Sequence, residues 1–231
     1  MKNNSVPTHM AFIMDGNRRW AKRKGLPTLK GHYKGYQRIV PLVEYAQKCG
    51  IKYITFWAFS TENWNRSKKE VDYLMDLFRK LFKSKLVKKL IDKGGRINIF
   101  GSLYPFPEDI QKSLKKIITD SKDNTKIVIN IGLNYGGRDE IIYAVKGIME
   151  DKLRPSQITK EIFAEYLYTK SQPDPDMIIR TGGTHRLSGF LPWQGVYSEL
   201  YFTKIFWPEF DEKEFDKALK AYSSRERRFG K

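Results

Sequence analysis

The sequence predicts an α/β fold: one domain with a mainly parallel central sheet flanked by helices. Short apolar runs rich in β-branched and aromatic residues alternate with segments of helical periodicity along all 231 residues. Such alternation favours parallel strands joined by helical connections. No linker, repeat or low-complexity segment divides the chain, so we expect residues 1–231 to form a single domain.

Strands and helices are predicted in alternation. Strands are typical of short apolar runs, and helices of apolar residues that recur every three or four positions. The expected strands span 9–15, 51–59, 96–101, 126–133, 176–181 and 199–202. The expected helices run from the first strand to Gly25 and then over 32–48, 67–92, 108–121, 138–150, 160–169 and 212–227. Pro41 lies inside the second helix, so we expect a kink or a late start there.

The helix expected over 67–92 carries an unusually wide apolar and aromatic stripe. Ser67 and Glu70 form a capping box at its start. The stripe consists of Val71, Leu74, Met75, Phe78, Leu81 and Phe82. It could be ordinary core or the lining of an apolar cavity, and the pattern fits both.

The net charge of +17 indicates an anionic partner. A nucleic acid, an anionic membrane surface and a diphosphate substrate all satisfy it, and lysines spread along solvated helices could account for much of the excess. The single Cys49 excludes an internal disulfide and agrees with a reducing compartment. No apolar signal segment opens the sequence and no run approaches about eighteen apolar residues, so we expect a cytoplasmic protein that at most touches a membrane peripherally.

Polar residues gather where three predicted strands end, in DGNRRW (15–20), STENWNR (60–66) and RTGGTHRLS (180–188). The carboxyl ends of parallel strands share one edge of a sheet, so these clusters should meet there. A cluster of basic residues with few acids would repel itself if empty, so it predicts a bound polyanion, and guanidinium groups suit phosphate oxygens. The basic residues are Arg18, Arg19, Arg66, Arg180, Arg186, His32 and His185.

Asp15 is an acid within this basic cluster. A carboxylate repels phosphate unless a cation lies between them, so we infer Mg²⁺. Gly16 permits close backbone approach, and the helix that follows presents free N–H groups to a phosphate. Alternatively, Asp15 and Asn17 could merely cap that helix, and residues 180–188 could be a simple turn. The two histidines could be packing residues, since no spacing supports zinc.

Several common reaction classes are disfavoured by absent motifs. The sequence has no phosphate-binding GxxxxGK[ST] loop, no GxGxxG, no GxSxG and no kinase set. ATP use, dinucleotide binding and serine hydrolysis are therefore disfavoured. A DDxxD-like aspartate pair is also missing.

Long motifs in a fixed order carry a family resemblance over nearly the whole chain. They are HMAFIMDGNRRWA (9–21), FWAFSTENWNR (56–66), NYGGRDEI (134–141), DMIIRTGGTHRLSGFLPWQGVYSELYF (176–202) and RERRFG (225–230). With these motifs the chain resembles the cis-prenyltransferases, the family of undecaprenyl diphosphate synthase and dehydrodolichyl diphosphate synthase.

This resemblance implies a reaction. It implies Mg²⁺-dependent addition of isopentenyl diphosphate units to an allylic diphosphate primer, farnesyl or geranylgeranyl diphosphate. The product would be a medium- or long-chain polyprenyl diphosphate, precursor of a glycosyl carrier lipid, grown in a hydrophobic tunnel.

The resemblance also implies roles for individual residues. Asp15 and Asn63 would be catalytic, and Asp15 and Glu199 would bind the metal. A neutral amide is a weak base, so Asn63 would position groups and relay the proton to a water or a diphosphate oxygen. The implied substrate-binding residues are Gly16, Asn17, Arg18, Arg19, Trp20, His32, Ser60, Thr61, Glu62, Trp64, Arg66, Arg180, Arg186, Leu187 and Ser188.

Some positions depart from the family pattern. Thr28 stands where many members have an arginine, so that contact is lost or taken over by Lys30. Gly189 and Pro192 look closer to archaeal than to bacterial members, which leaves the primer open. Ala58 is small where short-product relatives are bulkier, which predicts a medium or long product.

The resemblance also bears on partners. The segment Arg228 to Gly230 resembles a motif that reaches across a dimer interface, so we expect a homodimer, with a peripheral membrane contact for product release. A non-catalytic subunit would lose residues such as Asp15 and Asn63, which are present here. A nucleic-acid-binding protein is favoured only by the charge and the aromatic content, so we expect no nucleic-acid partner.

Overall fold

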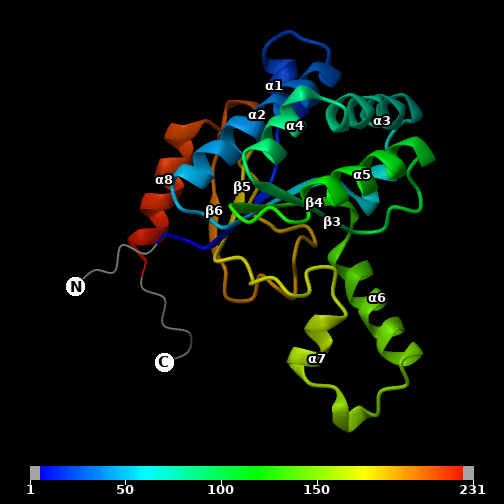
Figure 1. Ribbon diagram of the computed structural model, residues 1–231. Coiled ribbons are helices and arrows are strands. Elements are labelled where there is room, and N and C mark those ends of the chain that lie inside the picture. The colour runs from blue at the N-terminus through cyan, green and yellow to red at the C-terminus, as the bar shows by residue number, and fades with distance from the viewer. Residues whose placement is uncertain (1–5, 226–231) are drawn as a thin grey trace.

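The computed structural model describes residues 6–225, which are built around one sheet with most helices on one side of it (Figure 1). Within this range six strands pair in the order β3-β4-β2-β1-β5-β6. Every neighbouring pair is parallel, which confirms the predicted sheet. The strands are β1 (His9–Ile13), β2 (Tyr53–Ser60), β3 (Gly95–Phe100), β4 (Ile127–Tyr135), β5 (Met177–Arg180) and β6 (Glu199–Phe202).

Helices connect the strands and cover the sheet. In Figure 1, α1 to α5 and α8 lie over one side, while α6 and α7 extend from the body as an arm. None of the described helices is long and apolar enough to cross a membrane. The helices are α1 (Asn17–Arg23), α2 (Thr28–Lys48), α3 (Lys68–Phe82), α4 (Lys85–Asp92), α5 (Glu108–Ser121), α6 (Gly137–Glu150), α7 (Lys160–Glu165) and α8 (Glu212–Ser223), with 3-10 turns η1 (Thr61–Asn65), η2 (Pro155–Gln157) and η3 (Trp207–Glu209).

Two predicted helix boundaries are wrong. The single helix expected over 67–92 is two helices, because the Ser84 hydroxyl accepts a hydrogen bond from the Val87 N–H at 3.3 Å and starts α4 as its N-cap. Of the kink or late start expected at Pro41, the late start does not occur, since α2 begins at Thr28 and continues through the proline. Packing of a buried helix face outweighs the hydrogen bond that proline removes.

The core lies on both faces of the sheet, since side chains alternate along each strand. Phe12 of β1 points to the helical face, where it contacts Phe56, Trp207 and Phe215. Its neighbours Ala11 and Ile13 belong to the smaller cluster on the opposite face. Burying each large apolar side chain contributes roughly 1.5–3 kcal/mol, so these aromatic contacts hold β1, the strand that leads to Asp15, in place.

A buried polar network lies at the amino end of the sheet. His9 is 3% exposed, and its Nδ1–H donates to the Pro173 carbonyl at 2.7 Å. Its Nε2 then accepts from the Thr55 hydroxyl at 2.7 Å, and Thr55 accepts from the Asn130 amide at 3.0 Å. Burial lowers the pKa of His9 to about 4, with the Pro173 hydrogen bond and Asp176 opposing the shift.

Acidification should therefore destabilise the fold through His9. Its folded pKa of about 4 lies below the unfolded value of 6.5, so the unfolded chain binds the proton first and stability falls as the pH drops below 6.5. Between pH 7 and pH 4.5 this group should remove about 2–3 kcal/mol. Urea unfolding at both pH values checks this, with His9→Gln as comparison. An equal pH dependence in the two proteins would contradict the assignment.

Candidate active site

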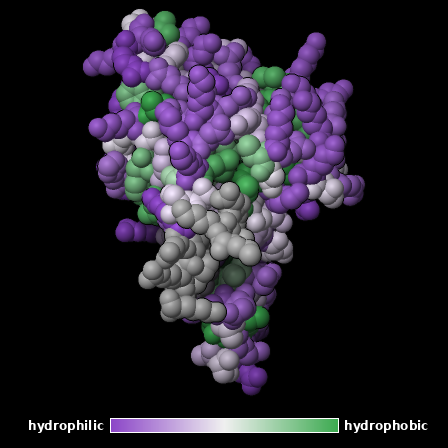
Figure 2. Space-filling view, turned by 90° about the vertical axis from the view of Figure 1, so that its left-hand side faces the viewer, coloured by the Kyte–Doolittle hydropathy of each residue, from purple (hydrophilic) through white to green (hydrophobic). Residues whose placement is uncertain are grey.

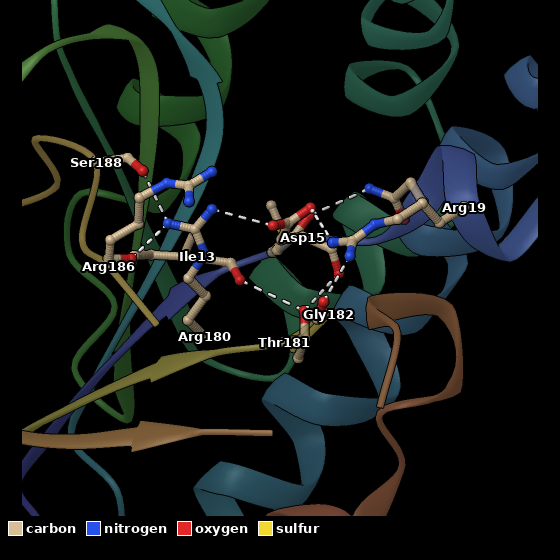
Figure 3. A network of polar contacts seen from close by, with 10 residues as sticks. Ile13, Asp15, Arg19, Arg180, Thr181, Gly182, Arg186 and Ser188 are labelled. Atoms are coloured by element: carbon tan, nitrogen blue, oxygen red, sulfur yellow. Dashed lines mark hydrogen bonds and ion pairs between the residues drawn. The ribbon is translucent and has the colours of Figure 1, made fainter. Parts of the chain in front are cut away.

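Asp15 lies two residues after the end of β1, at the centre of a polar network drawn in Figure 3. Its Oδ2 accepts from Nη2 of Arg180, the last residue of β5, at 3.0 Å. Its Oδ1 pairs with Nη2 of Arg19 on α1, also at 3.0 Å. The other arm of Arg180 donates to the Ser188 hydroxyl at 2.8 Å and to the Arg186 carbonyl. One carboxylate and two guanidinium groups from distant segments therefore converge, as the sequence predicted.

The backbone around Asp15 is fixed by the loops that follow β5 and β6. The Asp15 carbonyl accepts from the Thr181 hydroxyl at 2.7 Å and from the Trp207 N–H at 3.1 Å. Gly16 has φ 107°, and a Cβ there would lie 2.6 Å from a Phe206 ring carbon, so a side chain at this position would be strained and crowded. The Gly182 carbonyl accepts from Arg19 Nη1 at 2.7 Å, which aims that guanidinium at Asp15.

A second acid, Glu70 at the start of α3, pairs with three of the other basic groups. Its Oε1 lies 3.0 Å from Arg66 Nη1 and 3.4 Å from His32 Nε2, and its Oε2 lies 3.4 Å from Arg18 Nη1. Sequence reasoning assigned Glu70 to a capping box only. Ser67 does cap α3, but the Glu70 carboxylate faces the basic residues. Its spacing of four residues after Arg66 was the signal available in the sequence.

The environment holds His32 in its neutral form. Its pKa is lowered mainly by burial and further by the positive charges of Arg66 and Arg18, while Glu70 opposes the shift. The ring can therefore act as a hydrogen-bond donor without adding a positive charge at neutral pH.

Removing the Glu70 charge should lower the pKa of His32 further. Glu70→Gln takes away the group that opposes the shift and leaves the two nearby arginines in place. The chain has three histidines, so NMR titration of the imidazole signals can follow this one directly. Glu62→Gln, which removes an acid that lines the second of the two cavities over the site, is the matched control. An unchanged or raised pKa of His32 in Glu70→Gln would contradict this arrangement.

Two adjoining cavities of about 410 and 530 Å³ lie over these groups. Both are lined by Met14, Asp15, Asn17, His32 and Arg66. The first extends to Gly16, Arg18, Arg19, Lys22 and Thr28. The second extends to Ile13, Trp57, Ala58, Ser60, Glu62, Asn63, Leu74, Arg180, Arg186 and Ser188. Thr28 thus lines the site itself, whereas Lys30 is exposed and outside both linings.

Several predicted residues support the site from outside these linings. Trp64 donates its indole N–H to Asn134 at 2.8 Å and packs on Phe59. The Thr61 hydroxyl donates to Asp139 at 2.9 Å. The indole nitrogen of Trp20 is buried without a hydrogen-bond partner in the described part of the chain. Leu187 packs on the smaller core cluster. His185 stacks on Phe202.

Glu199 is not brought together with Asp15 within one chain. In the register of β5 and β6 it pairs with Met177, whereas Arg180, the partner of Asp15, pairs with Phe202. Three residues along a strand span about 10 Å, and the Glu199 carboxylate pairs with Arg225. The two implied metal ligands therefore lie toward opposite ends of the sheet.

The donor set at Asp15 fits Mg²⁺ held jointly with a diphosphate. Mg²⁺ is usually bound by one or two carboxylates together with substrate phosphate oxygens. The Asp15 carboxylate faces both cavities and remains partly exposed. Across residues 6–225 no group of three histidine, cysteine or acidic side chains could hold a metal, so an all-protein metal site does not occur there.

Residues 13–230 match the sequence profile of a family described as "Putative undecaprenyl diphosphate synthase". The chain belongs to the cis-prenyltransferase family. The isoprenyl transferase of Fusobacterium nucleatum is 48% identical over 98% of this chain and 96% of its own length. That of Aquifex aeolicus is 44% identical over 98% and 96%. These relatives are bacterial, so the expected closeness to archaeal members is not supported.

Solved structures of cis-prenyltransferases and related enzymes share the fold. Lavandulyl diphosphate synthase from Lavandula x intermedia, in complex with dimethylallyl diphosphate, superposes with a TM-score of 0.94 at 34% identity, covering 98% of this chain and 99% of that one. A probable undecaprenyl diphosphate synthase from Campylobacter jejuni gives 0.82 at 30% identity, with 98% and 100% covered. The chain is therefore a prenyltransferase of this family.

Proposed function

We propose that this prenyltransferase is Mg²⁺-dependent and extends farnesyl or geranylgeranyl diphosphate to a medium- or long-chain polyprenyl diphosphate, a precursor of a glycosyl carrier lipid. The observation that carries the proposal is the position of Asp15 between Arg19 and Arg180, beside a cavity that continues into an apolar one. The charged diphosphates need the polar cavity, and the hydrocarbon chain needs the apolar one beside it.

The reaction forms a bond between C1 of the allylic primer and C4 of isopentenyl diphosphate. The allylic C–O bond breaks, the diphosphate leaves with the electron pair, and a proton leaves C2 of the isopentenyl unit. The guanidinium groups of Arg18 and Arg19 would stabilise charge that develops on the departing diphosphate. Arg180, Arg186 and Ser188 would hold the second diphosphate. Bound Mg²⁺ at Asp15 would supply further positive charge toward the leaving group.

Asn63 orients groups in this scheme and does not accept the proton. Its Oδ1 already accepts a hydrogen bond from the Ser60 N–H at 3.1 Å, which fixes the start of η1. An amide is also a very weak base. A diphosphate oxygen is then the acceptor, with Asn63 holding the loop in place.

The apolar path begins at the wall of the second cavity. Ala58 and Leu74 line this cavity and also a smaller one of about 70 Å³, whose other walls are Met14, Asn17 and residues of α2, α3 and η3. The wide stripe on α3 is thus shared between core and cavity lining. The small side chain of Ala58 leaves this path open, which supports a medium or long product.

An elongation assay tests the proposal. The pure protein is incubated with labelled isopentenyl diphosphate, Mg²⁺ and one primer at a time, geranyl, farnesyl or geranylgeranyl diphosphate, and the products are sized. A ladder of lengthened diphosphates is expected with at least one primer. Failure with every primer would overturn the catalytic proposal, and activity in the presence of a chelator would overturn the metal requirement.

We also propose a homodimer, built through the arm. The motif Arg228 to Gly230 lies outside the described residues, but α6 carries apolar side chains that are more than half exposed. Ile142 is 56% exposed, Tyr143 54% and Met149 71%. Ile142 and Met149 lie seven residues apart and so share one helix face. A second copy of the chain would cover this face and protect it from water.

Charges on this face should break the dimer. Ile142→Glu combined with Met149→Glu should weaken self-association by at least roughly a hundredfold, because two carboxylates would be buried at the contact. Light scattering after gel filtration measures the mass. Tyr104→Glu is the matched control, since Tyr104 is 90% exposed and lies outside α6, in the loop between β3 and α5. A monomeric wild type, or a double variant that stays dimeric, would contradict the proposal.

For its location we propose the cytoplasm with peripheral contact to a membrane for product release. The net charge of +17 supports attraction to anionic lipid. Figure 2 shows one face of the molecule. Hydrophilic residues cover most of the described surface there, and apolar residues form small patches. Co-sedimentation with anionic and with neutral vesicles distinguishes this contact from a fully soluble enzyme.

A further inference from the structure

Tyr36 of α2 stands at the junction of two apolar cavities. The cavity next to the active site, about 70 Å³, is called the proximal cavity here. A deeper one of about 30 Å³, the distal cavity, lies between the sheet and α4 and α5. Tyr36, Ile39 and Leu81 line both cavities. The proximal cavity is also lined by Ala58, Leu74 and Phe78, and the distal one by Val87, Leu90, Ile97, Leu114 and Ile129.

Both cavities are too small for a long hydrocarbon chain. An apolar cavity of about 150 Å³ holds one benzene ring, and each of these is less than half as large. A polyprenyl chain that grows beyond the proximal cavity must therefore displace part of the wall. The wall at the junction consists of Tyr36, Ile39 and Leu81, and Tyr36 is the one among them with a hydrogen bond to another helix.

The Tyr36 hydroxyl links two elements at this junction. It donates a hydrogen bond to the Ser84 hydroxyl at 3.0 Å. Ser84 is the N-cap of α4, so the bond ties α2 to the break between α3 and α4. In the described part of the chain, Tyr36 provides the only hydroxyl in either cavity lining.

Helix α4 is the wall that this bond restrains. Its residues Val87 and Leu90 close the distal cavity from one side. The same helix is tied to α2 by exposed ion pairs from Lys89 and Lys93 to Glu44, at 2.9 and 3.0 Å. Exposed ion pairs stabilise little, so the buried contacts of the Tyr36 ring and its hydroxyl bond dominate at the junction.

We infer that Tyr36 is a specificity-determining residue that limits how far the product chain grows. The inference rests on the proposed elongation activity. The ring lines both the proximal and the distal cavity, and the hydroxyl bond to Ser84 joins α2 to the start of α4. Growth slows when the chain end reaches the ring, since further units require the ring to move and the hydroxyl to lose its partner.

Three substitutions at this position separate the ring from the hydroxyl. Tyr36→Ala removes both and should lengthen the main product by at least one isoprene unit. Tyr36→Phe keeps the ring and removes the hydrogen bond, so it should shift the products in the same direction by less. Tyr36→Trp adds bulk and should shorten them. Tyr33→Ala is the matched control, since Tyr33 lies one turn away on α2, is 40% exposed, and lines neither cavity.

The products are sized after extension of one primer with labelled isopentenyl diphosphate, and folding is checked by thermal unfolding. A wild-type product ladder in folded Tyr36→Ala would overturn the inference, as would an equal lengthening by Tyr33→Ala. If Tyr36→Ala does not fold, the opposite shifts expected of Tyr36→Phe and Tyr36→Trp decide the matter.

A binding measurement keeps the inference separate from the activity. Quenching of tryptophan fluorescence gives the affinities for a long-chain polyprenyl diphosphate and for geranyl diphosphate. Tyr36→Ala should raise the ratio of long-chain to short-chain affinity roughly tenfold, and Tyr33→Ala should leave it unchanged. If the wild type makes no product, the proposed function fails. An unchanged ratio in folded Tyr36→Ala would overturn the role of Tyr36 itself.

Discussion

Replacing Asp15 with alanine is expected to lower kcat by roughly a thousandfold or more. The variant loses the carboxylate that would bind Mg²⁺ beside the two diphosphates. It also leaves the guanidinium of Arg180, whose side chain is 7% exposed, without its carboxylate partner. A buried charge that loses its partner is destabilising, so the free energy of unfolding should fall as well. Steady-state kinetics and urea unfolding measure the two effects.

The metal role of Asp15 can be tested apart from turnover. Mn²⁺ serves as a paramagnetic probe, with inorganic pyrophosphate present. The wild type should bind Mn²⁺ and folded Asp15→Ala should not. Asp72→Ala, which removes an exposed acid from the outer side of α3, should behave as the wild type. Equal Mn²⁺ binding in Asp15→Ala and wild type would refute the metal role, and a near-normal kcat would refute the catalytic one.

Replacing Arg180 with alanine should lower kcat/KM for isopentenyl diphosphate by roughly a thousandfold. This guanidinium contacts Asp15, Ser188 and the Arg186 carbonyl at once. Its planar fork places two donors on one side for Ser188 and Arg186 and another toward Asp15. A lysine has a single ammonium group and cannot reproduce that geometry, so Arg180→Lys should recover only a small part of the loss.

Arg96→Ala, which removes an exposed guanidinium from β3, controls for the change in net charge. Its kinetics should match those of the wild type. If Arg180→Lys restored full activity, a positive charge alone would be enough to bind the diphosphate, and the forked geometry of the guanidinium would not be required. A loss confined to kcat with unchanged KM would place Arg180 in the chemical step instead of in diphosphate binding.

The convergence of Asp15, Arg19 and Arg180 could be predicted because the sheet is parallel. Each strand buried on both faces reads as a continuous apolar run, as in β1, where all five residues are buried. The residue after such a run lies at the carboxyl edge, so positions 165 residues apart could be expected to meet.

The long helix over 67–92 could not be divided correctly, because apolar residues continue at a spacing of four from Phe82 to Leu86 and Leu90. Only the Ser84 side chain decides the break, and serine within a helical pattern is common. The direction of the Glu70 carboxylate was equally hidden, because a capping box and an ion pair with Arg66 fit the same spacing.

The amino-acid sequence by itself determined the fold class and the basic edge of the sheet. Each apolar run marks a buried strand, and the residues that follow the run lie at the carboxyl edge of a parallel sheet. Tertiary structure alone decided that Glu199 lies about 10 Å along the sheet from the level of Arg180, that Trp64 faces Asn134, and that Tyr36 bonds Ser84 across the apolar cavities. These contacts depend on how separate helices and strands pack, and the spacing of residues along one segment carries no record of the segment that packs against it.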